Sequence, residues 1–385
     1  MNLNVSEIIP QDYEKIISSS KKQFIKFGAD PSAPDLHLGH CVVLFQLRKF
    51  QEMGHHVQFL IGDFTAKIGD PTGKSETRKP LTDDVIKLNS ETYQSQVFKI
   101  LDKSKTTVYY NSEWLSKLTS SDMINLAARF NVARMLERDD FEKRYKSGQS
   151  ISIHEFLYPL LQGYDSVILK NDLEIGGTDQ KFNLLVGRHL QREYEIGKEQ
   201  AIMTLPILEG TDGVKKMSKS LHNHIGILDA PEDMFGKVMS IPDNVLLTYL
   251  RLLGNKSENE LSLIQQGIQN NELNPRNVKV DLGKYLVSFF HSQEASQQAY
   301  SHFQTVFSKK EVPDNIPEKK VNQKTKLVDW LLQDGILSSK KEAFRLINQG
   351  GISIDGSKLT DPHYCFENKS VLVKVGKRKF FQVTI

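Results

Sequence analysis

Apolar residues follow two different periods along the first half of the chain. Short runs of β-branched and other apolar residues predict strands at 23–27, 57–61, 106–110, 173–175 and 202–208. Between these runs, apolar residues spaced three or four apart predict helices. Strands separated by long helical stretches are typical of βαβ units, so we expect an α/β fold with a parallel sheet in residues 1–228.

Two longer stretches carry the helical period without strands. Residues 112–165 predict a helical insertion between two halves of the sheet, and residues 229–312 predict an α-helical domain. Prolines and a charged run predict a linker at 313–324. Residues 325–385 combine two short helical segments with strand-like runs, and they predict a small C-terminal α+β domain.

The first long helix has an unusual start. The pattern predicts that Asp35 caps it and that Gly54 ends it. Its first turn holds Gly39 between His37 and His40, and a glycine inside a helix costs about 1 kcal/mol relative to alanine. Because a helix N-terminus also favours anions, this turn fits a phosphate-bearing ligand with a planar base. Two surface histidines beside a packing glycine are the alternative.

A second cluster, Lys216-Met217-Ser218-Lys219-Ser220, follows a Gly-containing turn and is called the lysine loop below. Flexible ammonium groups suit a charge that moves, such as departing pyrophosphate. A solvated loop is the alternative interpretation of the lysine loop alone. Two anion sites in one α/β domain favour chemistry on a nucleotide.

A Gly-rich turn at 69–73 carries Asp70 and is followed by Lys74 and Arg78. Its glycine spacing misses that of a P-loop by one residue. The segment still offers cations for phosphate oxygens and a carboxylate for an ammonium group.

Two polar features follow or accompany the later strands. Asp179 comes after a double glycine, and we expect its carboxylate both to bind ribose hydroxyls and to cap the next helix. Tyr158, Gln162 and Asp165 are spaced i, i+4, i+7, so they share one helix face. Beside leucines, these three side chains predict a pocket with a polar floor; a solvent-exposed face is the alternative.

The bulk composition is that of a soluble protein. The chain has 385 residues, of which 25% are charged and 39% hydrophobic, which allows two or three domains. No apolar run approaches the roughly 20 residues that span a bilayer. The N-terminal residues lack the basic start and apolar core of a signal peptide, so we expect a cytoplasmic protein without a membrane partner.

The two cysteines and the distribution of charge bear on which metal sites and partners we expect. Cys41 and Cys365 stand far apart, which argues against a disulfide framework or a thiolate zinc site, and we predict no dedicated protein site for a metal. Residues 309–385 carry 15 Lys/Arg and 9 Asp/Glu, a balance of +6, whereas the whole chain is +3. A basic tail indicates a polyanion partner, with a merely solvated surface as the alternative.

The turn at residues 37–40 is called the histidine turn below. Together with the lysine loop it resembles the signature pair of class I aminoacyl-tRNA synthetases. The segments 27–31, 69–74 and 176–180 resemble tyrosyl-tRNA synthetases of the bacterial branch that keeps the full lysine loop, and the resemblance covers essentially the whole chain. It implies a Rossmann-like catalytic domain that forms tyrosyl-adenylate and pyrophosphate from L-tyrosine and ATP. It also implies transfer of tyrosine to the 3′-terminal ribose of tRNA(Tyr), a Mg²⁺ requirement and a homodimer. The apolar helical stretch 127–136 is a candidate dimer surface, with a place in the core as the alternative.

The resemblance also implies roles for individual residues. The expected catalytic residues are His37, His40, Lys74, Lys216 and Lys219. The expected ATP-binding residues are Asp30, Ser32, Gly39, Arg78, Gly177, Asp179, Met217 and Ser218. The expected tyrosine-binding residues are Asp70, Tyr158, Gln162, Asp165 and Gln180, with Asp165 accepting the phenolic hydroxyl. The chain departs from better-known members at Lys26, where those have a tyrosine that also reaches the hydroxyl.

The tail resembles a small RNA-binding motif shared with a ribosomal protein, and its Lys340, Lys341 and Arg345 are the expected RNA-binding residues. Cationic helices of this kind grip phosphates without reading sequence. Three alternatives stay open: a tryptophanyl-tRNA synthetase, a non-catalytic RNA-binding paralogue and a small nucleotidyltransferase. The intact histidine turn and lysine loop argue against the second, and the chain length and tail argue against the third.

Overall fold

The chain divides into two compact units in its computed structural model. The structure describes residues 4–19, 21–71, 81–307, 316–366, 370–376 and 379–385. Internal contacts separate Met1–Ser296 from Gln297–Ile385. The boundary predicted at residue 228 falls inside the first unit, so a division between a catalytic and a helical domain stays a prediction.

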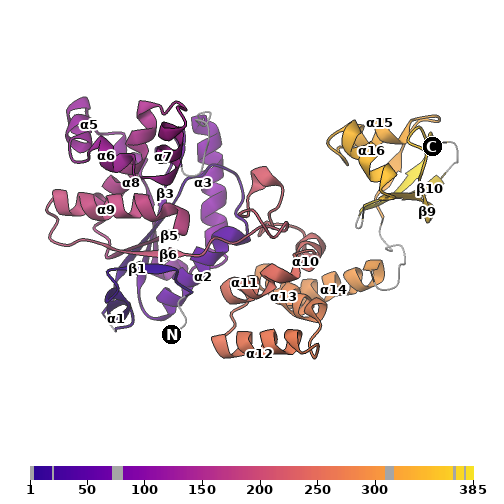
Figure 1. Cartoon of the computed structure of the whole chain (residues 1–385), viewed down its shortest axis with the longest axis horizontal. Helices are drawn as coiled ribbons and strands as arrows, with labels where there is room; N and C mark the ends of the chain where they lie inside the picture. Colours follow the sequence, from indigo (N-terminus) through magenta and orange to yellow (C-terminus); the bar gives the residue numbers. More distant parts are fainter. Residues whose placement is uncertain (1–3, 20, 72–80, 308–315, 367–369, 377–378) are drawn as a thin grey trace. The chain divides into compact units, whose positions relative to one another are not determined.

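A six-stranded sheet in the order β1-β6-β5-β2-β3-β4 forms the centre of the first unit (Figure 1). Its strands are β1 (Glu7–Ile9), β2 (Phe24–Ala29), β3 (His56–Ile61), β4 (Thr106–Tyr110), β5 (Leu173–Gly177) and β6 (Ala201–Leu205). All neighbours are parallel except β1, which runs antiparallel to β6. The α/β fold and the five predicted strands are confirmed; β1 is too short to stand out in the sequence.

Helices cover both faces of this sheet. The first unit contains α1 (Tyr13–Ile17), α2 (Leu38–Glu52), α3 (Asp83–Val97), α4 (Ser112–Leu115), α5 (Ser120–Ala127), α6 (Val132–Met135), α7 (Asp139–Lys146), α8 (Ile153–Leu169), α9 (Lys181–Glu193), α10 (Pro231–Met239), α11 (Asp243–Leu253), α12 (Glu258–Gln269) and α13 (Pro275–Phe290). Helices α2 and α3 lie on one side of the sheet, and α8 and α9 lie on the other (Figure 1). Successive strands are added on one side of β2 as β3 and β4, and on the other side as β5 and β6. Because β-α-β crossovers are right-handed, the helices that connect the two sets lie on opposite faces of the sheet.

The start of α2 differs from the sequence prediction. The residue that caps the helix is His37, so the prediction of Asp35 as N-cap was wrong. Backbone N–H groups of Leu38 and Ile227 donate to the carbonyls of Ile225 and Leu36, at 2.9 and 3.1 Å. This antiparallel pairing keeps the chain extended through residue 37 and delays the helix. The predicted stop is confirmed: α2 ends before Gly54, which has φ +97°.

The segment predicted as a helical insertion contains α4 to α7 and most of α8, joined by short turns. Helices α4 to α7 lie over α8 around a core that includes Phe141, Leu160 and Leu161. On its other side α8 approaches α9 closely, because Gly163 carries no side chain there. A Cβ atom at Gly163 would lie 3.2 Å from the backbone nitrogen of Gly187 and 2.8 Å from Leu190 Cδ1.

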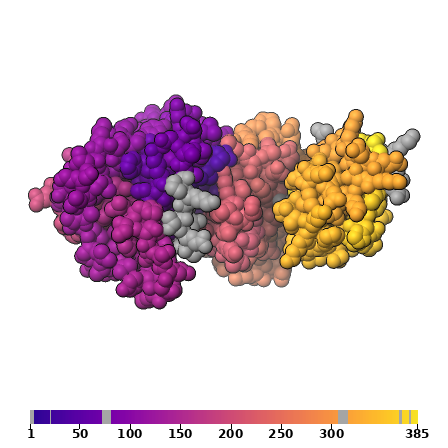
Figure 2. All heavy atoms as spheres, turned by 90° about the horizontal axis from the view of Figure 1, so that it is seen from above, coloured from indigo at the N-terminus to yellow at the C-terminus, as the bar shows by residue number. Residues whose placement is uncertain are grey.

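Helices α10 to α13 complete the first unit and contact its sheet layer through α2. The ring of Phe45 on α2 packs edge-on against Phe289 of α13, with centroids 5.1 Å apart. In the space-filling view the rose-coloured residues of this helical part adjoin the indigo and violet residues of the sheet layer (Figure 2). The lysine loop belongs to the segment that connects the two parts.

The second unit contains the end of α14 (Gln293–Phe307) and a five-stranded sheet in the order β7-β11-β10-β8-β9. Its elements are β7 (Glu318–Lys320), α15 (Leu327–Gln333), α16 (Lys340–Asn348), β8 (Ile352–Ile354), β9 (Ser357–Lys358), β10 (Ser370–Val375) and β11 (Lys379–Thr384). Trp330 and Phe366 fill its core. Strand β7 lies in the segment that we predicted as a linker. Its sequence, Glu-Lys-Lys, carries no apolar signal, and it joins the sheet edge through backbone pairing with β11.

In the part of the chain that the structure describes, no helix combines the length and the apolar character needed to cross a bilayer.

Close helix packing at Gly163 gives a test of this fold. We expect Gly163→Ala to lower the free energy of unfolding of the first unit by about 1–3 kcal/mol, because the added methyl group pushes α8 from α9. Denaturant unfolding followed by circular dichroism measures the change. Glu193→Ala, at the exposed end of α9, is the matched control and should leave the midpoint in place. An unchanged midpoint for Gly163→Ala would contradict the packing.

Candidate active site

The candidate site lies at the topological switch point of the sheet, between β2 and β5, where the strand order reverses. Strands β2 and β5 are parallel neighbours, and the chain leaves them toward α2 and α9 on opposite faces. Ligands of doubly wound folds bind in the crevice that this divergence opens at the carboxyl ends of the strands. Two adjoining cavities, of about 600 and 280 Å³, occupy the crevice, and Asp30, Ser32 and Tyr93 line both.

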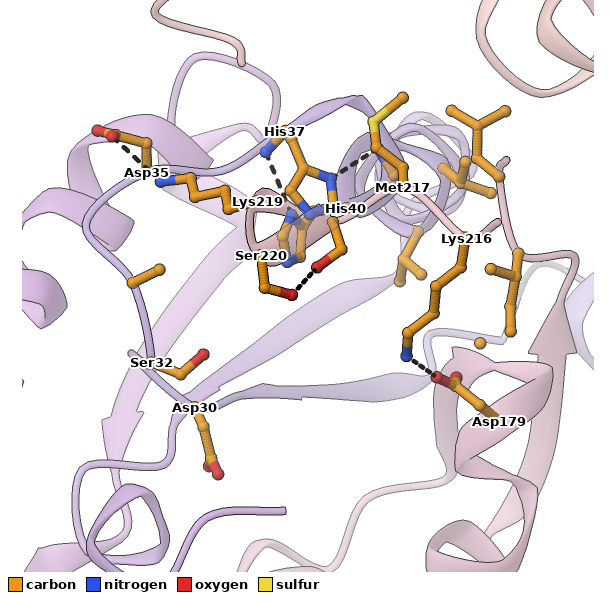
Figure 3. A pocket seen from close by; sticks show the side chains of 18 of the residues that line it. Asp30, Ser32, Asp35, His37, His40, Asp179, Lys216, Met217, Lys219 and Ser220 are labelled. Carbon is orange, nitrogen blue, oxygen red and sulfur yellow. Dashed lines mark hydrogen bonds and ion pairs between the residues drawn. The ribbon is translucent and has the colours of Figure 1, made fainter. Parts of the chain in front are cut away.

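The larger cavity gathers most of the residues expected to act on ATP. His37, His40, Lys216, Lys219, Asp30, Ser32, Gly39, Gly177, Asp179, Met217 and Ser218 line it. The histidines and the lysine loop lie together, and Asp30, Ser32 and Asp179 lie across the cavity from them (Figure 3). Lys74 and Arg78 lie outside the described residues.

The two histidines form a reciprocal cap at the start of α2. The backbone N–H of Gly39 donates to Nδ1 of His37, and the backbone N–H of His37 donates to Nδ1 of His40, each at 3.2 Å. Because each Nδ1 accepts a hydrogen bond from a backbone amide, the proton of each neutral ring must be on Nε2. The cap therefore fixes the tautomer of both imidazoles.

Gly39 allows this arrangement. A Cβ atom at Gly39 would lie 2.9 Å from Cε1 of His37 and 3.6 Å from Cβ of Met217. Any side chain there would displace the folded-back ring of His37, whereas the contact with the buried Met217 would be an ordinary one. The glycine that seemed costly inside a helix is thus required by its neighbours.

Both imidazoles are held in the neutral form. Burial lowers the pKa of His37 to about 2, with the nearby His40, His224 and two lysines acting in the same direction. Burial also lowers the pKa of His40 to about 4, partly offset by its backbone hydrogen bond with His37. Near neutral pH each ring is therefore an uncharged Nε2–H donor, and the positive charge of the cavity comes from lysines.

The two lysines of the lysine loop each rest on a carboxylate. Nζ of Lys216 lies 3.2 Å from Asp179, and Nζ of Lys219 lies 3.2 Å from Asp35. These pairs are partly exposed, so each contributes little to stability and is easily exchanged for a stronger anion. The prediction that Asp179 caps a helix was wrong, because Gly177 caps the short turn and Gln180 caps α9.

Asn223 fixes the backbone of the lysine loop, and no sequence motif singled this residue out. Its Oδ1 accepts from the backbone N–H of Ser218 at 2.8 Å. Its Nδ2 donates to Asp212 at 2.9 Å and to the carbonyl of Lys216 at 3.1 Å. The backbone of the lysine loop is therefore held while the ammonium groups remain free to move.

The smaller cavity holds all five residues expected to bind the amino acid: Asp70, Tyr158, Gln162, Asp165 and Gln180. Tyr158 and Asp165 are 5% and 1% exposed, so a solvent-exposed face of α8 is ruled out. The hydroxyl of Tyr158 donates to Asp30 at 2.9 Å. Gly28 leaves one wall open, because a Cβ atom there would meet only Leu60, at 3.8 Å.

Asp165 is the most deeply buried carboxyl group of this smaller cavity. Trp114 Nε1 donates to Oδ1 at 2.8 Å, and Asn111 Nδ2 donates to Oδ2 at 3.2 Å. Burial raises the pKa of Asp165 to about 7, although Lys26 and these two donors lower it. Sequence reasoning missed Asn111 and Trp114, which stand at the end of β4 and in a short helix without a recognisable motif.

Asp70 is held by a second set of donors. Nε2 of Gln180 lies 2.8 Å from one of its oxygens, and the buried Arg138 lies 3.3 Å from the other. Arg138 also pairs with Asp140 at 2.7 Å. Arg138 comes from the helical insertion, and nothing in the local sequence pointed to it.

The expected RNA-binding residues belong to the second unit. Lys340, Lys341 and Arg345 are all exposed on α16, where Lys340 pairs with Asp329 at 2.9 Å. Phe344, 37% exposed, lies among them. The helix presents cations and an aromatic ring to solvent together.

This arrangement joins two kinds of binding site. The larger cavity offers neutral N–H donors and movable cations, which suit a polyphosphate whose charge shifts during reaction. The smaller cavity offers a closed end with one buried carboxyl acceptor, which suits a small ligand with a hydroxyl donor. Among the residues that the structure describes, no three His, Cys, Asp or Glu side chains gather to hold a metal ion.

Comparison with known proteins gives matches over the whole chain. A family model described as "tRNA synthetases class I (W and Y)" matches residues 19–308, and one described as "Tyrosine--tRNA ligase SYY-like C-terminal domain" matches residues 308–383. The tyrosine–tRNA ligase of Moorella thermoacetica is 51% identical over 384 residues, covering 98% of this chain and 92% of the relative. That of Thermotoga maritima is 49% identical over 386 residues, covering 99% and 95%.

Solved structures share the fold at lower identity. The tyrosyl-tRNA synthetase of Archaeoglobus fulgidus, complexed with L-tyrosine, superposes with a TM-score of 0.62 at 22% identity, covering 77% of this chain and 96% of that one. A tryptophanyl-tRNA synthetase of Plasmodium falciparum superposes with a TM-score of 0.56 at 16% identity, covering 74% and 79%. At these sequence identities the structural matches establish only that the fold is shared.

The neutral histidines lead to a test by titration. We expect neither imidazole to titrate between pH 6 and 8, because their pKa values of about 2 and 4 lie below that range. Histidine NMR signals recorded against pH, assigned with His37→Asn and His40→Asn, measure this. A titration of either ring near its ordinary value of 6.5 would contradict the buried cap.

The same shifts fix the sign of the effect on stability. Between pH 6.5 and about 4 the unfolded state protonates His40 and the native state does not, so stability falls as the pH falls. In His40→Asn this slope should lessen by roughly 1.4 kcal/mol per pH unit.

Proposed function

The chain belongs to the tyrosine–tRNA ligases of the class I aminoacyl-tRNA synthetases, and we propose that its larger cavity binds ATP and its smaller cavity binds tyrosine. The enzyme activates L-tyrosine with ATP to tyrosyl-adenylate and pyrophosphate, and then transfers tyrosine to tRNA(Tyr). The close relatives named above exclude the tryptophanyl, non-catalytic and nucleotidyltransferase alternatives.

One observation carries the assignment of the cavities. The histidine cap and the lysine loop face the same cavity, and that cavity adjoins the pocket closed by Asp165. A tyrosine with its hydroxyl at Asp165 would direct its carboxylate toward the shared residues Asp30 and Ser32. The α-phosphate of ATP would lie at the same junction.

In the first step, the tyrosine carboxylate attacks the α-phosphorus in line, and the bond to pyrophosphate breaks. The nucleophile is already anionic, so the step needs no general base. The Nε2–H groups of His37 and His40 donate to phosphate oxygens as their charge increases. Lys216 and Lys219 leave their carboxylates and follow the pyrophosphate. Catalysis is then positioning and electrostatic stabilisation.

Contacts to the rest of ATP follow from the cavity walls. Gly39 offers bare backbone for the adenine, and Asp179 offers its carboxylate to the ribose hydroxyls once Lys216 departs. Gly177 lets the nucleotide approach β5. Met217 and Ser218 hold the lysine loop against it, and we propose that Lys74 and Arg78 act on its phosphates.

Hydrogen bonds from residues of the smaller cavity recognise the bound tyrosine. We assign Asp70, Tyr158 and Gln162 to the α-amino group and Gln180 to the carboxylate side. Asp165 accepts from the phenolic hydroxyl. A ligand without that hydroxyl leaves the buried carboxylate short of a partner, a rule for which tyrosyl-tRNA synthetases are the standard example.

We propose that Mg²⁺ arrives with ATP. The cavity carboxylates are engaged by protein donors: Asp30 accepts from Thr65 and Tyr158, and Asp179 and Asp35 pair with lysines. Phosphate oxygens would therefore hold the ion. When bound, it would neutralise phosphate charge alongside the two lysines.

We propose that the second unit binds tRNA through Lys340, Lys341 and Arg345 of α16. Exposed cations contact phosphates, and the neighbouring Phe344 offers a surface on which a base stacks. The cytoplasm, where tRNA is charged, is the proposed compartment. The free Cys41 and Cys365 agree with a reducing environment.

We propose a homodimer formed through the helical insertion. Ile124, Val132 and Ile153 are 69%, 62% and 78% exposed on α5, α6 and the start of α8. Large apolar side chains that one inserted segment exposes to solvent favour a protein interface on that segment. A second copy of the chain would cover them.

The site assignment predicts a particular pattern of kinetic loss. His40→Ala or Lys219→Ala should slow tyrosyl-adenylate formation about 100-fold or more, because each removes a contact that strengthens in the transition state. Tyrosine affinity should change little, since neither residue is assigned to it. Tyrosine-dependent ATP–pyrophosphate exchange and tyrosine titration give the two quantities.

Lys215→Ala is the matched control, because this exposed lysine neighbours the lysine loop but does not line either cavity. Equal losses of rate and of tyrosine affinity in His40→Ala would overturn the assignment. Exchange with tryptophan in place of tyrosine would overturn the reading of the smaller cavity.

The dimer proposal has its own test. Ile153→Asp places a charge in the proposed interface and should yield a monomer at concentrations where the unmodified chain sediments as a dimer. Leu263→Asp, at a residue 66% exposed on α12, is the control and should not change the sedimentation coefficient. A dimer that survives Ile153→Asp, Ile124→Asp and Val132→Asp would refute this surface.

A further inference from the structure

Lys26 stands fully buried in the wall of the smaller cavity. Side chains alternate across a strand, so Lys26 and Gly28 of β2 face the same side, toward α8. Its side chain is 0% exposed. Burying an ammonium group costs several kcal/mol unless partners replace its water, so the partners of this lysine define its role.

The protein already uses every proton of the Lys26 ammonium group. Its Nζ donates to Oγ of Ser166 at 2.7 Å and to the carbonyl of Gln162 at 3.1 Å. It pairs with Oε1 of Glu174 at 2.9 Å. An ammonium group has three N–H donors and no acceptor, so none remains for the hydroxyl of a ligand.

The partners of Lys26 are themselves fixed. Oε2 of Glu174 accepts from Oγ of Ser166 at 3.0 Å and from Nε2 of Gln200 at 2.5 Å. Asn171 donates to the other side of Gln200, at 2.8 Å. A Cβ atom at Gly187 would lie within 3.0 Å of Ser166, Glu174 and Gln200 atoms, so this network fills its space. The lysine is therefore held in place from several elements.

Asp165 lies on α8 between the two residues that accept from Lys26, Gln162 and Ser166, and it lines the same cavity as Lys26. Its two oxygens each accept one hydrogen bond, from Trp114 and from Asn111, and so keep capacity for a hydroxyl donor. The other carboxylates at this cavity have partners of their own: Asp30 accepts from Tyr158, Asp70 pairs with Arg138 and Asp179 pairs with Lys216. The charged groups that shift the pKa of Asp165 are Lys26 from β2 and Glu174 from β5. Of these, Lys26 has the larger effect and lowers the pKa of Asp165, against burial, which raises it.

We propose that Lys26 is a specificity-positioning residue that acts through Asp165: it supplies a fixed positive charge that holds Asp165 as an anionic acceptor for the tyrosine hydroxyl, without binding that hydroxyl itself. The inference rests on the proposed placement of tyrosine in the smaller cavity. In this proposal Asp165 alone accepts the hydrogen bond from the tyrosine hydroxyl, and Lys26 keeps Asp165 ionised without contacting the ligand.

Rejection of phenylalanine then depends on charge. Phenylalanine buries an ionised Asp165 without a hydroxyl partner, whereas a protonated Asp165 loses much less, because hydrogen bonds to charged groups are the stronger ones. The ratio of kcat/KM for tyrosine to that for phenylalanine should therefore rise with pH and level off once Asp165 is ionised.

The test removes both charges of the buried pair, because Lys26→Met alone would leave Glu174 unpaired and destabilise the fold. Lys26→Met/Glu174→Gln in the full chain keeps the size of both side chains. We expect the tyrosine to phenylalanine ratio from ATP–pyrophosphate exchange to fall about fivefold at neutral pH, because the ionised fraction of Asp165 falls there from about one half to about one tenth. The midpoint of its pH dependence should move up by about one pH unit.

Two further variants complete the experiment. Lys256→Met/Glu260→Gln removes an exposed Lys–Glu pair at the start of α12, with 2.9 Å between its charged atoms, and should change neither the ratio nor the midpoint. Asp165→Asn should abolish the pH dependence of the ratio. It also keeps the proposal testable if the double variant does not fold, since a ratio that still changes with pH in Asp165→Asn would overturn it.

Failure of this proposal differs from failure of the proposed function. If the unmodified chain showed no tyrosine-dependent ATP–pyrophosphate exchange, the proposed function itself would be contradicted. Normal exchange, with a folded double variant that keeps both the ratio and the midpoint, would overturn only the role of Lys26.

Discussion

Two backbone hydrogen bonds between the segments around Leu36 and Ile225 hold the candidate site together. They pair the residues before α2 with the residues after the lysine loop, although almost two hundred positions separate them in the chain. The pairing keeps residue 37 extended, which lets His37 cap α2 and turns its ring back over Gly39. It also brings the lysine loop beside that ring. Neither signature segment would face the other without this short extended pair.

The charges of the site divide into fixed and movable groups. Deep groups are paired and held on several sides, as Lys26 is by Glu174 and as Arg138 is by Asp70 and Asp140. Such pairs cannot rearrange without exposing a bare charge, so they set a constant field. The lysines of the lysine loop are only partly buried and rest on single carboxylates. They are free to follow a charge that moves, while the neutral histidines provide donors that stay in place.

How much the sequence revealed depends on whether a residue's role is local. Strands, the Gly54 stop and the residues at strand ends carry their signal in neighbouring residues, and they lie where the sequence predicted. The cap at Asp35 failed because a distant segment extends the chain there, and a local rule does not include that segment. Asn111, Trp114 and Arg138 were missed for the same reason. Each acts by donating to a carboxylate distant in sequence, and none stands in a pattern of its own.

Lys26 illustrates the limit of reading a position by its residue type. In the sequence it is a cation in place of a tyrosine, which suggests a substitute donor to the ligand. In the structure its donors are all used by protein acceptors, and its charge is what remains available to act. Charge acts across a few ångströms of low-dielectric interior without contact, whereas a hydrogen bond needs a free proton in the right direction. A buried lysine with a complete set of partners is therefore better suited to tuning a neighbouring carboxylate than to touching the substrate.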